Sequence, residues 1–164
     1  MILVADASTL ITLARIGRLD LLRQLAGIVH IPEAVYGEVV TRGAGRPGAG
    51  EIALAEWISR RPVRDRRAVN RLRNRIGWGE AEAIVLALEL GADAVILDDA
   101  TARRVGEAEG QKVLGLLGLL LESKTRGIVS AVRPLLDEMV AAGFFVDDAL
   151  YRLILRQAGE PPTP

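Results

Sequence analysis

Gly79-Glu80-Ala81-Glu82-Ala83 begins the part of the chain around which the other segments can be placed. These residues open an Ala-, Leu- and Val-rich run that stops at Gly91, and this composition predicts a helix. Ala94-Val95-Ile96-Leu97 follows as a short apolar run that predicts a buried strand, and it leads directly into Asp98-Asp99. A helix and the strand after it run in opposite directions, so we expect the acids of both segments at one edge of a sheet. Like charges at one edge repel unless they are protonated or bridged by cations, and this pattern indicates a divalent metal.

The composition indicates one domain with an aliphatic core. The chain has 164 residues, of which 50% are hydrophobic and only 4% are aromatic. Leu, Ile, Val and Ala must therefore build the core, as they do when helices cover a parallel sheet. The formal net charge is zero, so bulk charge does not indicate nucleic acid as a partner.

Cysteine usage and the N-terminal residues bear on the cellular location. The chain has no cysteine, which excludes disulfides, thiolate nucleophiles and cysteine metal sites and is compatible with the cytoplasm. The opening residues MILVADAS lack a basic region and reach an aspartate early, so they predict a strand and not a signal peptide. The apolar run 113–121 is too short to span a bilayer. We therefore expect a cytoplasmic protein without a membrane partner.

Strands and helices alternate along the chain. Strands are predicted at residues 2–5, 28–31, 94–97 and 112–114. Helices are predicted at residues 8–17, 19–26, 33–41, 51–59, 80–91, 101–109, 116–124, 130–142 and 147–158, with a loop at 42–50 and an arginine-rich segment at 60–75. This alternation predicts an α/β fold with a short parallel central sheet and helices on both faces.

Two further acids belong to this picture. Asp6 ends the first predicted strand, and sites in parallel sheets lie beyond the carboxyl ends of the strands. Glu38 lies in the segment AVYGEVV with apolar neighbours, so a partly buried carboxylate there needs a partner. All the candidate ligands are oxygen atoms, which suit Mg²⁺ or Mn²⁺ and not zinc. His30, the one histidine, sits in an apolar strand and is interpreted as structural.

Each acidic motif also has a purely structural interpretation. Acids in a first helical turn complement the helix dipole, and Asp98-Asp99 alone could cap the next helix. Residues two apart do not share a helix face, so Glu80 and Glu82 can reach one metal only if Glu80 lies at the cap. A shared site is nevertheless favoured, because capping alone does not bring carboxylates from three chain segments to one edge.

The residues resemble the PIN domain family. The resemblance rests on Val4-Ala5-Asp6-Ala7-Ser8, the Glu38 helix, Gly79-Glu80-Ala81-Glu82-Ala83 and Leu97-Asp98-Asp99, in the right order over about residues 1–127. More narrowly, the chain resembles the branch related to VapC-type toxins, described as predicted nucleic-acid-binding proteins. The paired glutamates are also similar to those of the flap-endonuclease relatives of this fold.

The resemblance implies a PIN-like three-layer α/β/α sandwich with a nuclease domain at residues 1–127. Residues 128–158 would be C-terminal helices that complete or extend the same domain, and residues 159–164 would be a flexible tail. The family implies Mg²⁺ or Mn²⁺ held by Asp6, Glu38, Glu80, Asp98 and Asp99. Ser8 would be the accompanying hydroxyl in catalysis, and Glu82 a further catalytic carboxylate. Glu80 is favoured over Glu82 at the position that the two patterns leave ambiguous.

The implied activity is metal-dependent hydrolysis of phosphodiesters by a ribonuclease. Cations held by the carboxylates would lower the pKa of a bound water and polarise the phosphate. The substrate would be RNA, with DNA as the alternative. The family also implies a homodimer, and a toxin held inactive by a small antitoxin protein.

Arginines are the candidate phosphate contacts. Eight lie within 16 residues before the acidic helix, and two follow the acidic pair: Arg60, Arg61, Arg64, Arg66, Arg67, Arg71, Arg73 and Arg75, then Arg103 and Arg104. A solvated arginine-rich helix explains the run equally well, because 19 of the 21 basic residues are arginine. With so few aromatic residues, base stacking is not a strong prediction.

The alternative function is a PIN-like module without catalytic activity that binds nucleic acid or a partner protein. Its candidate surfaces are the leucines of 116–121, Phe144-Phe145 and the segment 151–154, although packing into the core explains these residues as well. Loss of one acidic position would favour this module, and none is lost.

Overall fold

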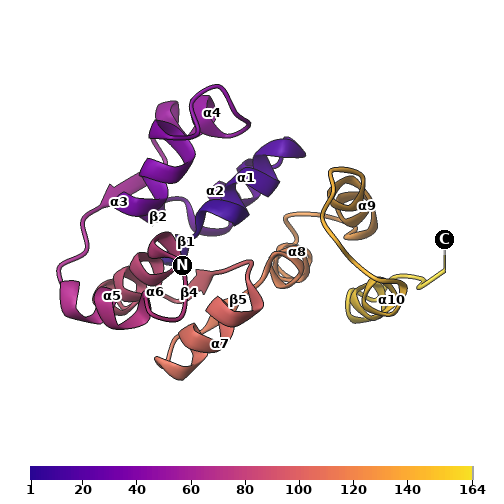
Figure 1. Cartoon of the computed structure of the whole chain (residues 1–164). Coiled ribbons are helices and arrows are strands. Elements are labelled where there is room, and N and C mark those ends of the chain that lie inside the picture. Colours follow the sequence, from indigo (N-terminus) through magenta and orange to yellow (C-terminus); the bar gives the residue numbers. More distant parts are fainter. Residues whose placement is uncertain (164) are drawn as a thin grey trace.

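Five parallel strands form the centre of the protein (Figure 1). A computed structural model describes residues 1–163. The strands are β1 (Leu3–Ala5), β2 (Val29–Pro32), β3 (Ile58–Arg61), β4 (Ala94–Ile96) and β5 (Val113–Leu114), in the order β3-β2-β1-β4-β5. Each neighbouring pair is parallel. The prediction of an α/β fold around a short parallel sheet is confirmed.

Successive residues of each strand face opposite layers of the molecule. Leu3, Ala5 and Ile96 belong to one buried apolar cluster, whereas Val4 and Val95 belong to the other. The first layer holds α1 (Ala7–Arg15), α2 (Asp20–Ala26), α3 (Glu33–Tyr36), α4 (Ala49–Leu54), α8 (Leu116–Thr125), α9 (Arg133–Ala141) and α10 (Asp148–Gln157). The second holds α5 (Arg66–Leu72), α6 (Trp78–Leu90) and α7 (Ala100–Ala108). Strands buried on both faces explain why β1 and β4 are apolar throughout.

Helix α6 is packed on nearly all sides over its first three turns. Its eight buried residues, Gly79, Ala81, Glu82, Ala83, Ile84, Val85, Leu86 and Ala87, leave little of that part in water. Glu80 caps the start by accepting a hydrogen bond from the Gly77 N–H at 3.0 Å, and Gly91 ends the helix in the left-handed conformation with φ 58°. The small alanines let α6 approach the sheet closely, which fixes the position of its acidic first turn.

The predicted helix at 51–59 is wrong in its second half. Helix α4 ends at Leu54, and Ile58–Arg61 forms the edge strand β3, paired in register with β2 from Val29↔Ile58 to Pro32↔Arg61. This strand is polar and becomes part of the sheet by pairing with β2, so no local pattern marks it. The arginine-rich segment consequently divides between β3 and α5.

The predicted helix at 33–41 changes its winding at Gly37. Helix α3 is followed by a π-helical turn, η1 (Gly37–Thr41), in which the Arg42 N–H donates to the Gly37 carbonyl five residues earlier at 2.8 Å. The extra residue per turn changes the direction of the Glu38 side chain. Such π-turns are frequent at functional sites.

The C-terminal helices α9 and α10 project on the side of α8 away from the sheet (Figure 1). They contribute Leu136, Met139 and Leu155 to the same apolar cluster as β1. Glu160 accepts hydrogen bonds from the Val132 N–H at 2.6 Å and from Lys124 Nζ at 2.8 Å, which holds the end of the chain on α8 and α9.

The division at residue 127 and the flexible tail stay predictions. Pro164, the last residue of that tail, lies outside the described residues. No helix within residues 1–163 is long and apolar enough to cross a membrane.

Gly106→Ala should destabilise the protein. A Cβ at Gly106 of α7 would lie 2.9 Å from a Val113 methyl and 3.3 Å from a Leu97 methyl, so it would overpack the core by about 1–3 kcal/mol. Gly118→Ala in α8 is the matched control, because its nearest contact would be 3.6 Å and helix propensity favours alanine. Urea unfolding of both variants tests this; equal effects would contradict the packing at Gly106.

Candidate functional site

Asp6 joins two structural elements at the carboxyl edge of the sheet. It follows β1 directly and is only 2% exposed. Its Oδ1 accepts a hydrogen bond from the Thr9 N–H at 2.8 Å and its Oδ2 from the Asp98 N–H at 2.9 Å. Burial raises the pKa of Asp6, and these hydrogen bonds oppose that shift only in part. Asp6 therefore fixes the start of α1 against the end of β4.

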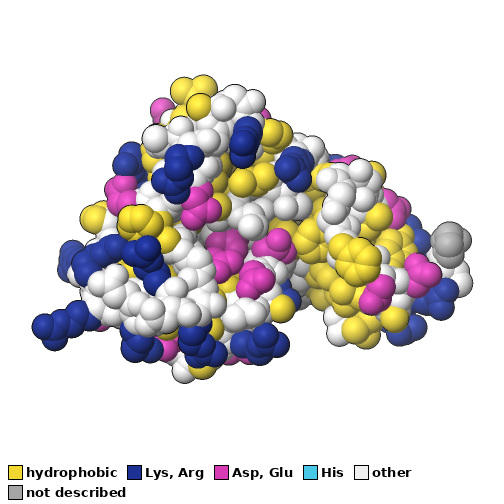
Figure 2. Space-filling view, viewed as in Figure 1, with side chains coloured by type: hydrophobic (Ala, Val, Ile, Leu, Met, Phe, Trp, Pro, Cys, Tyr) yellow, Lys and Arg dark blue, Asp and Glu magenta, His cyan; other side chains and the backbone are white. Residues whose placement is uncertain are grey.

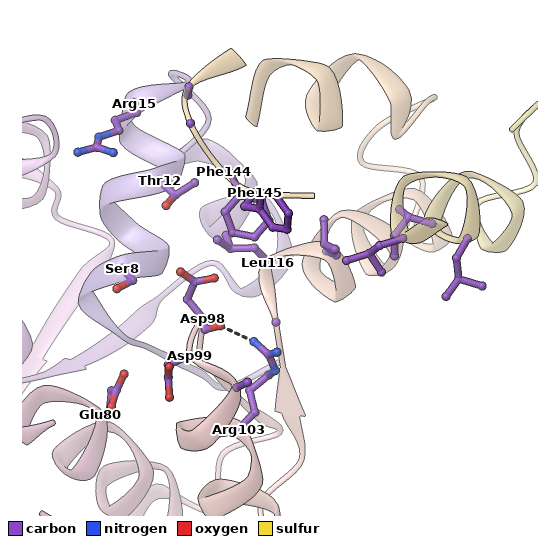
Figure 3. Close-up of a pocket in the computed structure, with 18 of the residues that line it drawn as sticks. Ser8, Thr12, Arg15, Glu80, Asp98, Asp99, Arg103, Leu116, Phe144 and Phe145 are labelled. Carbon is purple, nitrogen blue, oxygen red and sulfur yellow. Dashed lines mark hydrogen bonds between the residues drawn. The ribbon is translucent and has the colours of Figure 1, made fainter. Parts of the chain in front are cut away.

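Asp98 and Asp99 follow β4 at the same edge. Asp99 caps α7 by accepting a hydrogen bond from the Ala102 N–H at 2.9 Å. Arg103 donates a hydrogen bond to the backbone carbonyl of Asp98 (Figure 3). Burial and the charges of Asp6 and Asp99 raise the pKa of Asp98, while Arg103 lowers it. The helix cap that the sequence analysis considered for Asp98-Asp99 is present, made by Asp99, and both carboxylates still lie beside Asp6.

Glu80 reaches this edge from the first turn of α6. One oxygen holds the Gly77 N–H, as the cap described above. Burial raises the pKa of Glu80, and the charges of Asp99, Asp6 and Glu38 raise it further. In Figure 3, Glu80, Asp98, Asp99 and Ser8 surround the same space from three elements.

Glu38 completes the group by lying over Gly79. A Cβ at Gly79 would be 2.2 Å from Glu38 Oε1, so only glycine leaves room for that carboxylate. Burial raises the pKa of Glu38 most, Asp6 raises it further, and Arg42 and the Gly79 N–H lower it. Sequence reasoning missed Gly79 and Arg42 as parts of the site. A glycine inside the first turn of a helix, where it costs helix stability, was the available signal for Gly79.

Five carboxylates from four chain segments thus meet at one edge. A small hollow of about 140 Å³ is lined by Asp6, Ala7, Ser8, Glu38, Gly77, Gly79 and Glu80. It shares Ser8 and Glu80 with a larger groove of about 1060 Å³, which runs toward α10. Figure 2 shows the acids gathered in this central depression, with basic side chains around its rim.

The side chains of this acidic cluster (Asp6, Glu38, Glu80, Asp98 and Asp99) do not converge on one point. Within residues 1–163, no three Asp, Glu or His side chains stand close enough to form a metal site as they are. Yet four of the five have a pKa raised by burial and by one another. This donor set is all oxygen and concentrates negative charge, so it fits a hard divalent cation such as Mg²⁺ or Mn²⁺.

Comparison with known families assigns the chain to one of them. A family model described as a PIN domain matches residues 2–160. The chain belongs to the PIN domain family. No curated protein matches it. PIN domains are generally nucleases and typically use divalent metal ions.

Glu82 of this PIN domain lies apart from the acidic cluster. It is 2% exposed, and its Oε2 accepts a hydrogen bond from the Ala34 N–H at 2.8 Å. Its Oε1 accepts from Arg66 Nη1 at 2.7 Å and from Trp78 Nε1 at 3.0 Å. These three donors compensate its burial. The structure therefore separates the two glutamates: Glu80 faces the cluster, and Glu82 joins α6 to α3 and α5.

The arginines predicted to bind nucleic acid divide into two groups. Several are engaged within the protein: Arg60 with Glu33, Arg66 with Glu82, Arg71 with Glu109, Arg73 over the Trp78 ring, Arg103 with the Asp98 carbonyl and Arg104 with Thr101. Over the described part of the chain, no side-chain hydrogen bond or ion pair engages Arg61, Arg64, Arg67 or Arg75. The run is thus partly structural and partly available to a ligand.

The groove beside the acidic cluster has an apolar wall. Its lining includes Leu116, Leu117, Phe144, Phe145, Leu150, Leu153 and Ile154. Phe145 is 85% exposed, and it lines the groove together with Phe144, Leu116 and Asp98 (Figure 3). The residues that the sequence analysis assigned either to a partner surface or to the core therefore divide between the two. Ile154 is buried, and Phe145 is open to solvent.

Asp98→Asn should stabilise the protein at neutral pH. Raised pKa values mean that the folded state holds protons to a higher pH than the unfolded chain, so the cluster costs stability as pH rises from about 4 through those values. Removing one charge should raise the free energy of unfolding by up to about 1 kcal/mol at pH 7, and the gain should shrink toward pH 4. Urea unfolding across this range measures it.

Glu56→Gln serves as the control, because Glu56 lies just before β3 at the opposite edge of the sheet. It should give no such pH-dependent gain. A destabilised Asp98→Asn variant at pH 7 would contradict the repulsion assigned to the cluster.

Proposed function

We propose that this PIN domain is a Mg²⁺- or Mn²⁺-dependent endoribonuclease that hydrolyses phosphodiester bonds at the acidic cluster. The observation that carries the proposal is the meeting of five carboxylates from four chain segments at the carboxyl edge of the sheet, where burial and neighbouring acids raise the pKa of Asp6, Glu38, Glu80 and Asp98. Maintaining such repulsion costs stability, and a bound cation removes that cost. Family membership supports the nuclease chemistry.

Asp6, Glu38, Glu80, Asp98 and Asp99 would hold the cation. When bound, it supplies Lewis acidity toward the phosphate and lowers the pKa of a water ligand. Ser8 is exposed at the border of the hollow and the groove, where its hydroxyl can donate a hydrogen bond to a phosphate oxygen. Arg42 and Arg103 flank the cluster and can stabilise charge that develops on the phosphate.

The chain's one histidine does not suggest a competing mechanism. His30 lies within β2, and burial and the charge of Arg61 lower its pKa. It belongs to the sheet, while the cluster lies beyond the strand ends. Proton removal by a histidine base is therefore not part of the proposal.

RNA is the proposed substrate, and its phosphates need cations around an acidic site. Arg61, Arg64, Arg67 and Arg75 are free to supply them, and each phosphate contact adds to the salt dependence of binding. A cytoplasmic location would follow from such a substrate.

We further propose that the protein is a toxin and forms a homodimer. We propose the groove as the surface for a protein partner such as a small antitoxin. Its apolar wall adjoins Glu80 and Asp98, so a protein that covered Phe144 and Phe145 would also cover the acidic cluster. The same wall supports the second candidate, a PIN domain that binds a partner without catalysis. Metal-dependent cleavage distinguishes the two functions.

Asp6→Asn should abolish Mg²⁺- or Mn²⁺-dependent RNA cleavage. The amide removes a central ligand charge, and loss of a metal ligand typically costs several kcal/mol of transition-state stabilisation, or roughly a thousandfold in rate. Cleavage of labelled RNA by wild type and variant measures this. Glu56→Gln should retain full activity. Cleavage by the folded Asp6→Asn variant at the wild-type rate would refute the assignment.

Glu80→Gln and Glu82→Gln should affect different properties, metal binding in the first and stability in the second. Glu80→Gln should weaken Mn²⁺ binding, measured by calorimetry, with a small change in stability. Glu82→Gln leaves three donors facing a neutral amide, so it should lower the free energy of unfolding by about 1–3 kcal/mol while Mn²⁺ binding persists. The reverse pattern would make Glu82 the ligand.

A further inference from the structure

Thr9 carries a fully buried hydroxyl beside the acidic cluster. It is the third residue of α1, directly after Ser8, and it is 0% exposed. Within residues 1–163, its Oγ1 has no hydrogen-bond partner. An unpaired buried hydroxyl destabilises a fold, and valine, which has nearly the same shape, would avoid that cost. The hydroxyl is therefore expected to have a use that packing does not provide.

The other fully buried hydroxyl of a helix in this protein is satisfied by its own helix. In α8, Ser123 Oγ donates to the Leu119 carbonyl at 2.8 Å. This bond to the carbonyl four residues earlier is common for serine and threonine inside a helix. Thr9 lies in the first turn of α1, and the residue four positions before it, Ala5, belongs to β1. Helix α1 itself thus offers Thr9 no such carbonyl.

Asp6 is the group beside this hydroxyl. The Thr9 N–H donates to Asp6 Oδ1 at 2.8 Å, and the Thr9 side chain lies close enough to the carboxylate to lower its pKa, although it makes no well-formed hydrogen bond. Asp6 has two donors, the N–H groups of Thr9 and Asp98. Glu82, which is also 2% exposed, has three. A third donor is thus what Asp6 lacks and what Thr9 can supply.

We propose that Thr9 is a positioning residue for Asp6, whose hydroxyl donates to the Asp6 carboxylate when the acidic cluster holds its cation. A carboxylate offers about four lone-pair positions. The N–H groups of Thr9 and Asp98 occupy two, the hydroxyl fills a third, and one is left for the cation in the hollow that Asp6 lines. Thr9 itself touches neither cation nor substrate. The inference rests on the proposed metal-dependent function.

Thr9→Val tests this role by calorimetric titration with Mn²⁺. The substitution removes the hydroxyl and keeps the shape of the side chain. Groups that hydrogen-bond a metal ligand typically contribute about ten- to a hundredfold in metal affinity, so we expect the affinity for Mn²⁺ to fall by that factor. In EDTA, the urea midpoint of unfolding should equal or exceed that of wild type, because an unpaired buried hydroxyl has been removed.

Three further variants separate the hydroxyl from its surroundings. Thr9→Ser keeps the hydroxyl without the methyl group and should retain most of the affinity for Mn²⁺. Thr9→Ala removes the hydroxyl as well and should lose affinity as Thr9→Val does, so the test does not depend on one variant. Thr125→Val is the matched control, because it removes a hydroxyl that is bonded to the Leu121 carbonyl in α8, and it should leave Mn²⁺ binding unchanged.

RNA cleavage supplies a second readout. In Thr9→Val, the Mn²⁺ concentration that gives half the maximal rate should rise by the same factor as the dissociation constant. The KM for RNA at saturating Mn²⁺ should stay at the wild-type value, because Thr9 acts through the metal ligand and not on the substrate.

The results that contradict the inference differ from those that contradict the nuclease. Wild-type Mn²⁺ affinity in Thr9→Val removes the positioning role and leaves the proposed function intact. Weaker binding in both Thr9→Val and Thr9→Ser, together with a lower urea midpoint in EDTA, makes Thr9 a packing residue. Failure of the wild-type protein to bind Mn²⁺ refutes the proposed metal site together with the role of Thr9.

Discussion

Repulsion between carboxylates at one edge of the sheet is the constraint on which the rest of this structure depends. Asp6 stands at its centre, buried and held by the backbone N–H groups of Thr9 and Asp98. Those two bonds fix the positions of α1 and β4, and through them the positions of Asp98 and Asp99. Burial raises the pKa of Asp6, Glu38, Glu80 and Asp98, and neighbouring acids raise it further, because charges in a partly buried site are poorly screened.

The rest of the fold supplies what such a site needs. Two apolar layers on a sheet buried from both faces stabilise the domain enough to tolerate an unfavourable edge. Close packing of α6 fixes Glu80, and the π-turn at Gly37 directs Glu38 over Gly79. A cation that binds there replaces repulsion with attraction, so ligand binding and stability are linked at this edge.

Two glutamates two positions apart, Glu80 and Glu82, lie in different environments. Glu82 is deeper than Glu80, yet three donors satisfy it, and it holds α3, α5 and Trp78 in place. Glu80 has one donor and three acidic neighbours. The same network that satisfies Glu82 also orients the Trp78 indole, whereas Glu80 faces the acidic cluster.

The sequence by itself determined the parallel α/β fold, the family and the edge at which the acids gather, because strand ends and helix starts follow from hydrophobic pattern and glycine stops. It could not assign β3, because this polar edge strand is defined by its pairing with β2. It favoured Glu80 over Glu82 but could not show the three donors that hold Glu82, the clearance at Gly79, or the division of the arginines between ion pairs and free cations. These depend on distances between segments far apart in the chain, and only packing in three dimensions sets such distances.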